Sequence, residues 1–135
     1  MMKPKTLERG WGGHFICAER CIFRRNTLID WGGKKKVVVS TVGMMRDIHK
    51  PNEKHFDTIG AGGRYYETMA FHAEKVGPYW DANVSKQINF KSEWAICSET
   101  GWKDLPKDAD NSANAMHERV VKELSRRYVA PSLTR

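Results

Sequence analysis

The first hundred positions of the chain contain short apolar runs separated by glycine-rich turns. The longer runs occupy positions 21–31, 34–42 and 64–73. Their length, and their content of β-branched and aromatic residues, predict strands rather than helices. Shorter strands are predicted at 14–18, 56–59, 84–90 and 93–97. The run 84–90 alternates apolar with polar residues, which indicates one buried face, and Lys86 is the exception on that face.

The periodicity changes near residue 110. Ala113, Met116, Val120, Leu124 and Tyr128 recur at steps of three and four, before Pro131. This spacing predicts an amphipathic helix over 111–129. The chain is therefore expected to have an α+β fold, an antiparallel β meander of about six or seven strands with one C-terminal amphipathic helix packed on it.

The predicted organisation has a single domain. Residues 1–10 are expected to form a flexible N-terminal arm, and 11–135 one α+β domain. Within that domain, 11–97 would form the sheet, 98–110 a polar linker and 111–129 the helix. A chain of 135 residues with 40% hydrophobic composition suits one domain with its own core.

Neither a secretory leader nor a membrane segment is predicted. The opening residues are basic but lead into no apolar stretch, and no apolar run approaches the about 20 residues that span a bilayer. The three cysteines are an odd number and fit small apolar fillers better than a disulfide framework. We therefore expect a cytoplasmic protein that has no membrane partner.

The positive charge is concentrated at one end of the sequence. Residues 1–54 contain 12 Lys and Arg against 5 acids, whereas the remaining residues carry equal numbers of each, so the net +7 belongs to the N-terminal part. A one-sided field of this kind attracts a polyanion or an acidic protein face. The sequence therefore indicates a partner that is nucleic acid, an acidic host protein or a nucleoprotein complex.

The predicted contact surface combines these cations with aromatic rings. Arg25 would lie on the apolar face of its strand, where it must be paired or reach the rim, because an isolated buried charge is costly. Basic strand residues beside exposed rings are typical of proteins that hold single-stranded nucleic acid. The candidate binding residues are Arg20, Arg24, Arg25, Lys34, Lys35, Lys36, Arg46, Lys50, Trp31, Tyr79 and Trp80.

No metal site, cofactor or catalytic residue is assigned from the sequence. His14, Cys17 and Cys21 are close in sequence, but their spacing is wrong for a zinc knuckle, and alternation places the first two on opposite faces. His72 is the best single candidate for a general base. Glu67, five positions earlier, would point to the opposite face, so the two cannot form a dyad alone.

Three runs of the chain, at 9–18, 38–43 and 66–73, resemble small uncharacterised proteins encoded by phages, plasmids and integrative elements. The resemblance covers most of the chain and implies a context, because compact proteins of mobile elements often bind and obstruct host machinery, including nucleic-acid-guided defence complexes.

These observations favour a non-enzymatic binding protein that engages nucleic acid or a complex that handles it, with inhibition of host defence of the anti-CRISPR type as the most specific version. One alternative is a small hydrolase or nucleotide-processing enzyme that uses His72 or His14 with a nearby carboxylate. Another is a structural or assembly protein, with the helix stripe or the turn at Tyr79 and Trp80 as its interface.

Overall fold

The computed structural model describes residues 3–11, 13–14, 20–46, 56–57, 59, 65–91 and 107–131. Its elements are β1 (Lys5–Arg9), β2 (Cys21–Asp30), β3 (Lys36–Arg46), β4 (Phe56–Asp57), β5 (Tyr66–Val76), β6 (Tyr79–Ile88) and α1 (Lys107–Leu124). Two predicted strands, 14–18 and 93–97, lie wholly or largely outside these residues. The candidate binding residue Lys50 also lies outside them.

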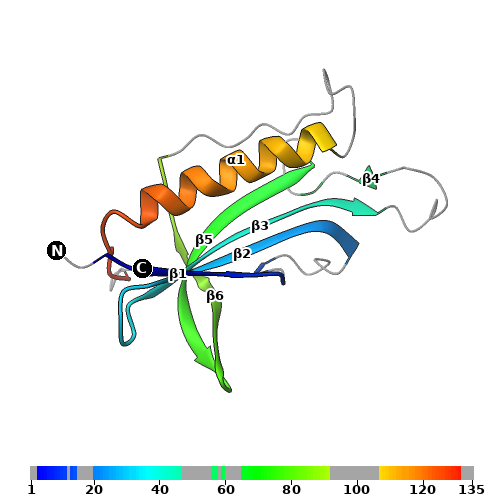
Figure 1. Ribbon diagram of the computed structural model, residues 1–135. Coiled ribbons are helices and arrows are strands. Elements are labelled where there is room, and N and C mark those ends of the chain that lie inside the picture. The colour runs from blue at the N-terminus through cyan, green and yellow to red at the C-terminus, as the bar shows by residue number, and fades with distance from the viewer. Residues whose placement is uncertain are drawn as a thin grey trace.

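Five antiparallel strands form a continuous sheet in the order β1-β2-β3-β5-β6, and the two-residue β4 pairs with the end of β3. Helix α1 lies across one face of this sheet (Figure 1). The α+β class, the antiparallel meander and the packed C-terminal helix are thus confirmed. The described residues contain five strands on the main path instead of the predicted six or seven.

The predicted flexible arm was wrong for residues 5–9, which form the edge strand β1. Lys5 pairs with Asp30 and Arg9 with Asn26, so the strand is held by a backbone ladder to β2. Four of its five side chains are exposed, which leaves no hydrophobic alternation in the sequence from which to recognise it. Arg9 is the buried exception, and its guanidinium donates to the Asn26 side chain and to the Trp80 carbonyl.

Glycines with positive φ close the two hairpins. Gly32 and Gly33, at φ values of 99° and 55°, connect β2 to β3, as the sequence predicts. Gly77, at 59°, connects β5 to β6. The turn lies before the predicted turn at Tyr79 and Trp80, because both of these residues already belong to β6.

The helix is shifted toward the N-terminus relative to its predicted span of 111–129. It begins at Lys107, inside the predicted linker, and ends at Leu124. Tyr128 keeps the apolar spacing but lies beyond the helix, where its ring meets His72 at a centroid distance of 5.9 Å. Apolar spacing alone cannot distinguish another helical turn from a segment that folds back onto the same core.

The main core lies between α1 and the sheet. Its members are Ile29, Val37, Val39, Ala70, Ile88, Met116, Val120 and Leu124. Strand β3 is buried on both faces, which agrees with its continuous β-branched run. On the face away from α1, the His14 ring lies 5.8 Å from that of Phe71, so the chain around Gly13 covers part of that side.

Candidate nucleic-acid interface

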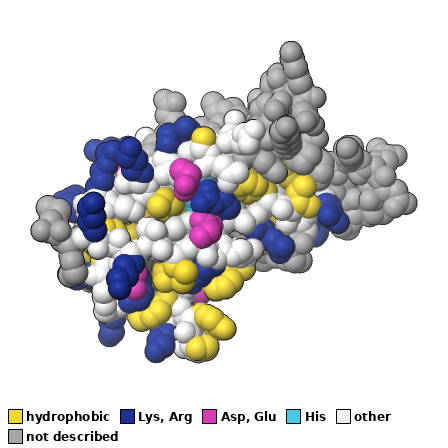
Figure 2. All heavy atoms as spheres, in the orientation of Figure 1, with side chains coloured by type: hydrophobic (Ala, Val, Ile, Leu, Met, Phe, Trp, Pro, Cys, Tyr) yellow, Lys and Arg dark blue, Asp and Glu magenta, His cyan; other side chains and the backbone are white. Residues whose placement is uncertain are grey.

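The predicted cationic residues do not share one surface. Arg20 donates to the Arg46 carbonyl over 2.8 Å, at the end of the β2–β3 pair where Cys21 faces Met45. The lysine run 34–36 lies at the other end, where Asp30 faces Lys36. Strand β2 is ten residues long, so its two ends are about 30 Å apart along the strand. The face seen in Figure 2 accordingly carries Lys and Arg side chains spread along the molecule, with acidic side chains among them.

Two of the predicted contacts are already neutralised within the protein. Arg25 pairs with Glu8 at 2.6 Å and with Glu118 of α1 at 3.2 Å. The sequence predicted that Arg25 must be paired or reach the rim, and this is confirmed. Lys36 is mostly buried, pairs with Asp30 at 3.1 Å and lies over the Trp80 ring. Neither cation is available as a simple phosphate contact.

The predicted aromatic residues lie in three different environments. Trp31 is partly buried against the core beneath α1, so it provides no open stacking surface. Tyr79 is 60% exposed and meets Trp11 edge-on. Trp80 is half-buried on β6, beside Lys36. Arg24 is exposed on β2. Among the predicted residues that the structure describes, Lys34 and Trp80 line one of the cavities described below.

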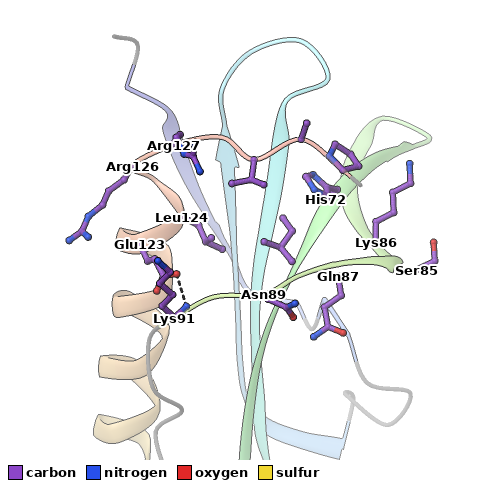
Figure 3. Close-up of a pocket in the computed structure, with 14 residues that line it drawn as sticks. His72, Ser85, Lys86, Gln87, Asn89, Lys91, Glu123, Leu124, Arg126 and Arg127 are labelled. Carbon is purple, nitrogen blue, oxygen red and sulfur yellow. Dashed lines mark hydrogen bonds between the residues drawn. The ribbon is translucent and has the colours of Figure 1, made fainter. Parts of the chain in front are cut away.

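A cationic groove lies between β6 and the segment that follows α1. It consists of two cavities, of about 800 and 460 Å³, which share His72, Lys86 and Pro131 in their walls. We call this pair of cavities the β6 groove. Its basic residues are Lys34, Lys75, Lys86, Lys91, Arg126 and Arg127, and its acidic residues are Glu74 and Glu123. Figure 3 shows the larger cavity.

An irregularity in β6 opens this groove. Pairing with β5 passes from Ala73–Ala82 to Phe71–Gln87, so residues 83–86 lie opposite His72 alone. Asn83 stabilises the irregular segment, because its Oδ1 accepts from the Ser85 amide and hydroxyl. An insertion of this kind bends the strand and breaks its alternation. It explains the exception at Lys86, and it corrects the predicted buried position of Val84, which is 65% exposed.

The electrostatics of the groove favour an anion. Its six cations outnumber its two carboxylates, and these have local partners: Glu74 accepts from Asn83, and Glu123 accepts from the Lys91 amide. Burial, together with the neighbouring charge of Lys86, lowers the pKa of His72 below its ordinary value. The imidazole is therefore neutral at pH 7, and the positive field comes from the Lys and Arg side chains.

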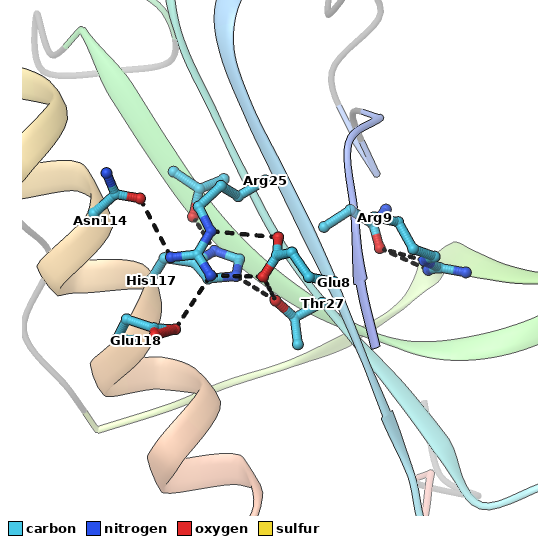
Figure 4. Close-up of polar contacts among 9 residues, drawn as sticks. Glu8, Arg9, Arg25, Thr27, Asn114, His117 and Glu118 are labelled. Atoms are coloured by element: carbon cyan, nitrogen blue, oxygen red, sulfur yellow. Dashed lines mark hydrogen bonds and ion pairs between the residues drawn. The ribbon is translucent and has the colours of Figure 1, made fainter. Parts of the chain in front are cut away.

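A second histidine, His117, lies fully buried between α1 and the sheet (Figure 4). Its Nε2 is 2.7 Å from Thr27 Oγ1, and its Nδ1 is 2.8 Å from Thr41 Oγ1. Thr27 donates its only proton to Glu8, so its oxygen must accept from Nε2–H. The neutral ring then accepts from Thr41 at Nδ1, and Thr41 in turn accepts from Thr68 at 2.7 Å.

This network was missed at the level of sequence, although a signal was present. His117 occupies the same buried stripe as Ala113 and Val120, but it was not among the histidines considered. Burial and, to a smaller extent, the Arg25 charge lower its pKa to about 4, although Glu8 opposes the shift. The arrangement holds a neutral imidazole in the core.

The third cluster joins His14 to a serine and a glutamate. His14 Nδ1 is 2.7 Å from Ser40 Oγ, and Nε2 is 3.0 Å from Glu67 Oε1. Glu67 therefore points away from His72, as predicted, and pairs with the other candidate histidine. The order serine–imidazole–carboxylate is that of a nucleophilic triad. However, Ser40 has no exposed surface, and its Oγ also accepts from the Gly13 amide at 3.0 Å.

We expect Ser40→Ala to lower the free energy of unfolding by about 1–3 kcal/mol, because the Gly13 amide and His14 Nδ1 lose a buried partner. Urea denaturation measures this change, with Thr6→Ala on the exposed side of β1 as the control. A fluorophosphonate probe, which labels accessible nucleophilic serines, should leave Ser40 unlabelled. Labelling at Ser40 would instead identify the cluster as an active site and support the hydrolase alternative.

No protein-family model matches the chain, and neither a curated protein nor a solved structure matches it significantly. Within the described residues, no helix has both the length and the apolar composition needed to cross a membrane. The same residues contain no group of three or more His, Cys, Asp or Glu side chains arranged to hold a metal ion.

Proposed function

We propose that this protein binds nucleic acid through the β6 groove and performs no catalysis there. The observation that carries the proposal is the excess of six cations over two carboxylates around two neighbouring cavities that share three lining residues. Phosphate contacts of this kind supply most of the affinity of proteins for nucleic acid. This location differs from the predicted one, because the groove is built largely from the C-terminal half of the chain.

The groove also presents aromatic surface beside its cations. Trp80 and Tyr128 line the smaller cavity together with Lys34, Lys75 and Lys86. A positively charged channel bordered by rings suits a chain of phosphates and bases better than a single small anion. The remaining parts of the predicted function, a mobile genetic element and inhibition of host defence, stay predictions that rest on the resemblance.

Neutralising the groove tests this proposal. We expect Lys86→Gln combined with Arg127→Gln to weaken oligonucleotide binding and to reduce the steepness of its salt dependence. Each lost phosphate contact should change the slope of log K against log salt by about 0.7–0.9. Fluorescence anisotropy with a labelled 12-mer, across a salt series, measures both quantities.

Arg24→Gln combined with Arg46→Gln is the matched control, since it removes two exposed charges from β2 and β3, away from the groove. This variant should keep both the affinity and the slope of the unchanged protein. If it loses as much binding as the groove variant, affinity follows net charge and not the β6 groove. Absence of binding by the unchanged protein at low salt would refute the proposal outright.

A further inference from the structure

His72 presents a largely buried imidazole to the β6 groove. Only 7% of its surface is exposed, and its ring meets that of Tyr128 edge-on. A polar group in such a position favours a ligand that can hydrogen-bond to it. The ring lies in the walls of both cavities of the β6 groove. Figure 3 shows it on β5, facing the segment that follows α1.

The surroundings of His72 combine an aromatic wall with cations. Tyr128 meets the imidazole edge-on at 5.9 Å, and Trp80 borders the same cavity. Lys34 and Lys86 line that cavity as well, and Lys35 lies 5.8 Å from the Tyr128 ring centre. These three kinds of group suit the base and the phosphate of a nucleotide. Rings can stack on a base, a polar side chain can bond its edge, and ammonium groups can hold its phosphate.

We infer that the cavity behind residues 83–86 takes one unstacked nucleotide of a single-stranded nucleic acid, with the base against Tyr128 and Trp80 and hydrogen-bonded to His72. Lys34 and Lys86 hold the adjoining phosphates. The inference rests on the proposed function and specifies its ligand as single-stranded rather than duplex. At about 460 Å³, the cavity falls in the size range of sites for small organic ligands.

The neutral state of His72 fits this role. A neutral imidazole offers one donor and one acceptor, which suits the edge of a base, whereas an imidazolium offers donors only. Burial and Lys86 lower the pKa of His72, and so keep the ring neutral at pH 7. A duplex cannot use the cavity in the same way, because its bases are paired and stacked. Opening it for one nucleotide costs a few kcal/mol.

The test compares His72→Leu with the unchanged protein on a single-stranded 12-mer, as DNA and as RNA, and on a 12-base-pair duplex. Loss of the hydrogen bond to a base should weaken single-strand binding about tenfold and leave duplex binding unchanged. The Lys86→Gln, Arg127→Gln variant should weaken both. His72→Gln, which keeps a donor and an acceptor, should recover part of the single-strand affinity. Circular dichroism verifies that each variant is folded.

A second readout probes the cavity directly. Titration with thymidine or uridine 5′-monophosphate should shift the imidazole ¹⁵N signals of His72 and leave those of the buried His117 in place. Oligonucleotide binding that is indifferent to His72→Leu, or that favours the duplex, would overturn this inference while the proposed function stands. Failure to bind either strand form would remove both. A difference between the DNA and RNA arms identifies which sugar the site accepts.

Discussion

Replacing Gly43 by alanine is expected to lower the free energy of unfolding by about 3 kcal/mol or more, enough to unfold a protein of marginal stability. Gly43 lies inside β3, with Phe23 of β2 on one side and Tyr66 of β5 on the other. A Cβ atom there would lie 2.5 Å from the Tyr65 carbonyl oxygen and 2.3 Å from Tyr66 Cδ1. The first clash is with backbone, so rotation of a side chain cannot relieve it.

The surrounding contacts leave this site little room to adjust. The Tyr66 ring meets Phe23 edge-on at 5.2 Å and is almost wholly buried. The Met44 amide donates to the Tyr65 carbonyl at 2.9 Å, with Met44 at a φ of 52°, so the backbone here is already unusual. A shift of β5 to admit a methyl group would disturb both contacts.

Urea denaturation monitored by tryptophan fluorescence measures the effect. Gly10→Ala is the matched control, because a Cβ at Gly10 meets nothing within 4 Å, and its stability should change by less than about 0.5 kcal/mol. Equal stability of Gly43→Ala and Gly10→Ala would show that β3 and β5 do not approach each other as closely as described.

Gly43 also illustrates what the sequence could and could not supply about the fold. The β-branched run in this region predicts a strand, and β3 is one; the structure adds that it is buried on both faces. The close approach of Tyr66 depends on the neighbouring strand, 23 positions later, which local composition does not encode. Strand β1 could not be recognised from local composition either. It is held by backbone hydrogen bonds to β2, and its mostly exposed side chains show no hydrophobic alternation.

The candidate site was predicted in part. The pairing of Arg25 followed from strand alternation, because a charge on an apolar face needs a partner. The dispersal of the other cations follows from the predicted hairpin itself: antiparallel pairing brings Arg20 and Arg46 to one end and the lysine run to the other. A count of charges along the sequence does not show that these two groups of cations lie at opposite ends of the hairpin.

The β6 groove was beyond the reach of the sequence. Its cations come from β5, β6, the β2–β3 turn and the segment after α1, and the second half of the chain has no net charge. The two carboxylates that line the groove, Glu74 and Glu123, have local hydrogen-bond partners. The one local signal was Lys86, whose place on an apolar face marked the irregularity that opens the cavity.

Stability is expected to fall as the pH is lowered from about 6.5 to about 4, by up to about 3 kcal/mol, because of His117. Its pKa is about 4 in the folded protein, against an ordinary value of 6.5, so the unfolded chain binds the extra proton first. Protonation of Nδ1 would remove the acceptor to which Thr41 donates. Two donors would then face each other inside the fully buried network that includes Thr68. The nearby Arg25 charge adds to the cost, and Glu8 offsets part of it.

His117→Gln isolates this contribution, because glutamine can occupy the network but does not titrate in this range. Urea denaturation at a series of pH values should give a variant that is less stable at pH 7 and whose stability is flatter between pH 6.5 and 4.5. Below that range both proteins should lose stability as Glu8 becomes protonated. Burial raises the pKa of Glu8, but the hydrogen bonds from Arg25 and Thr27 have the larger combined effect and lower it. Parallel curves for the two proteins above pH 4.5 would show that His117 is not held neutral by the fold.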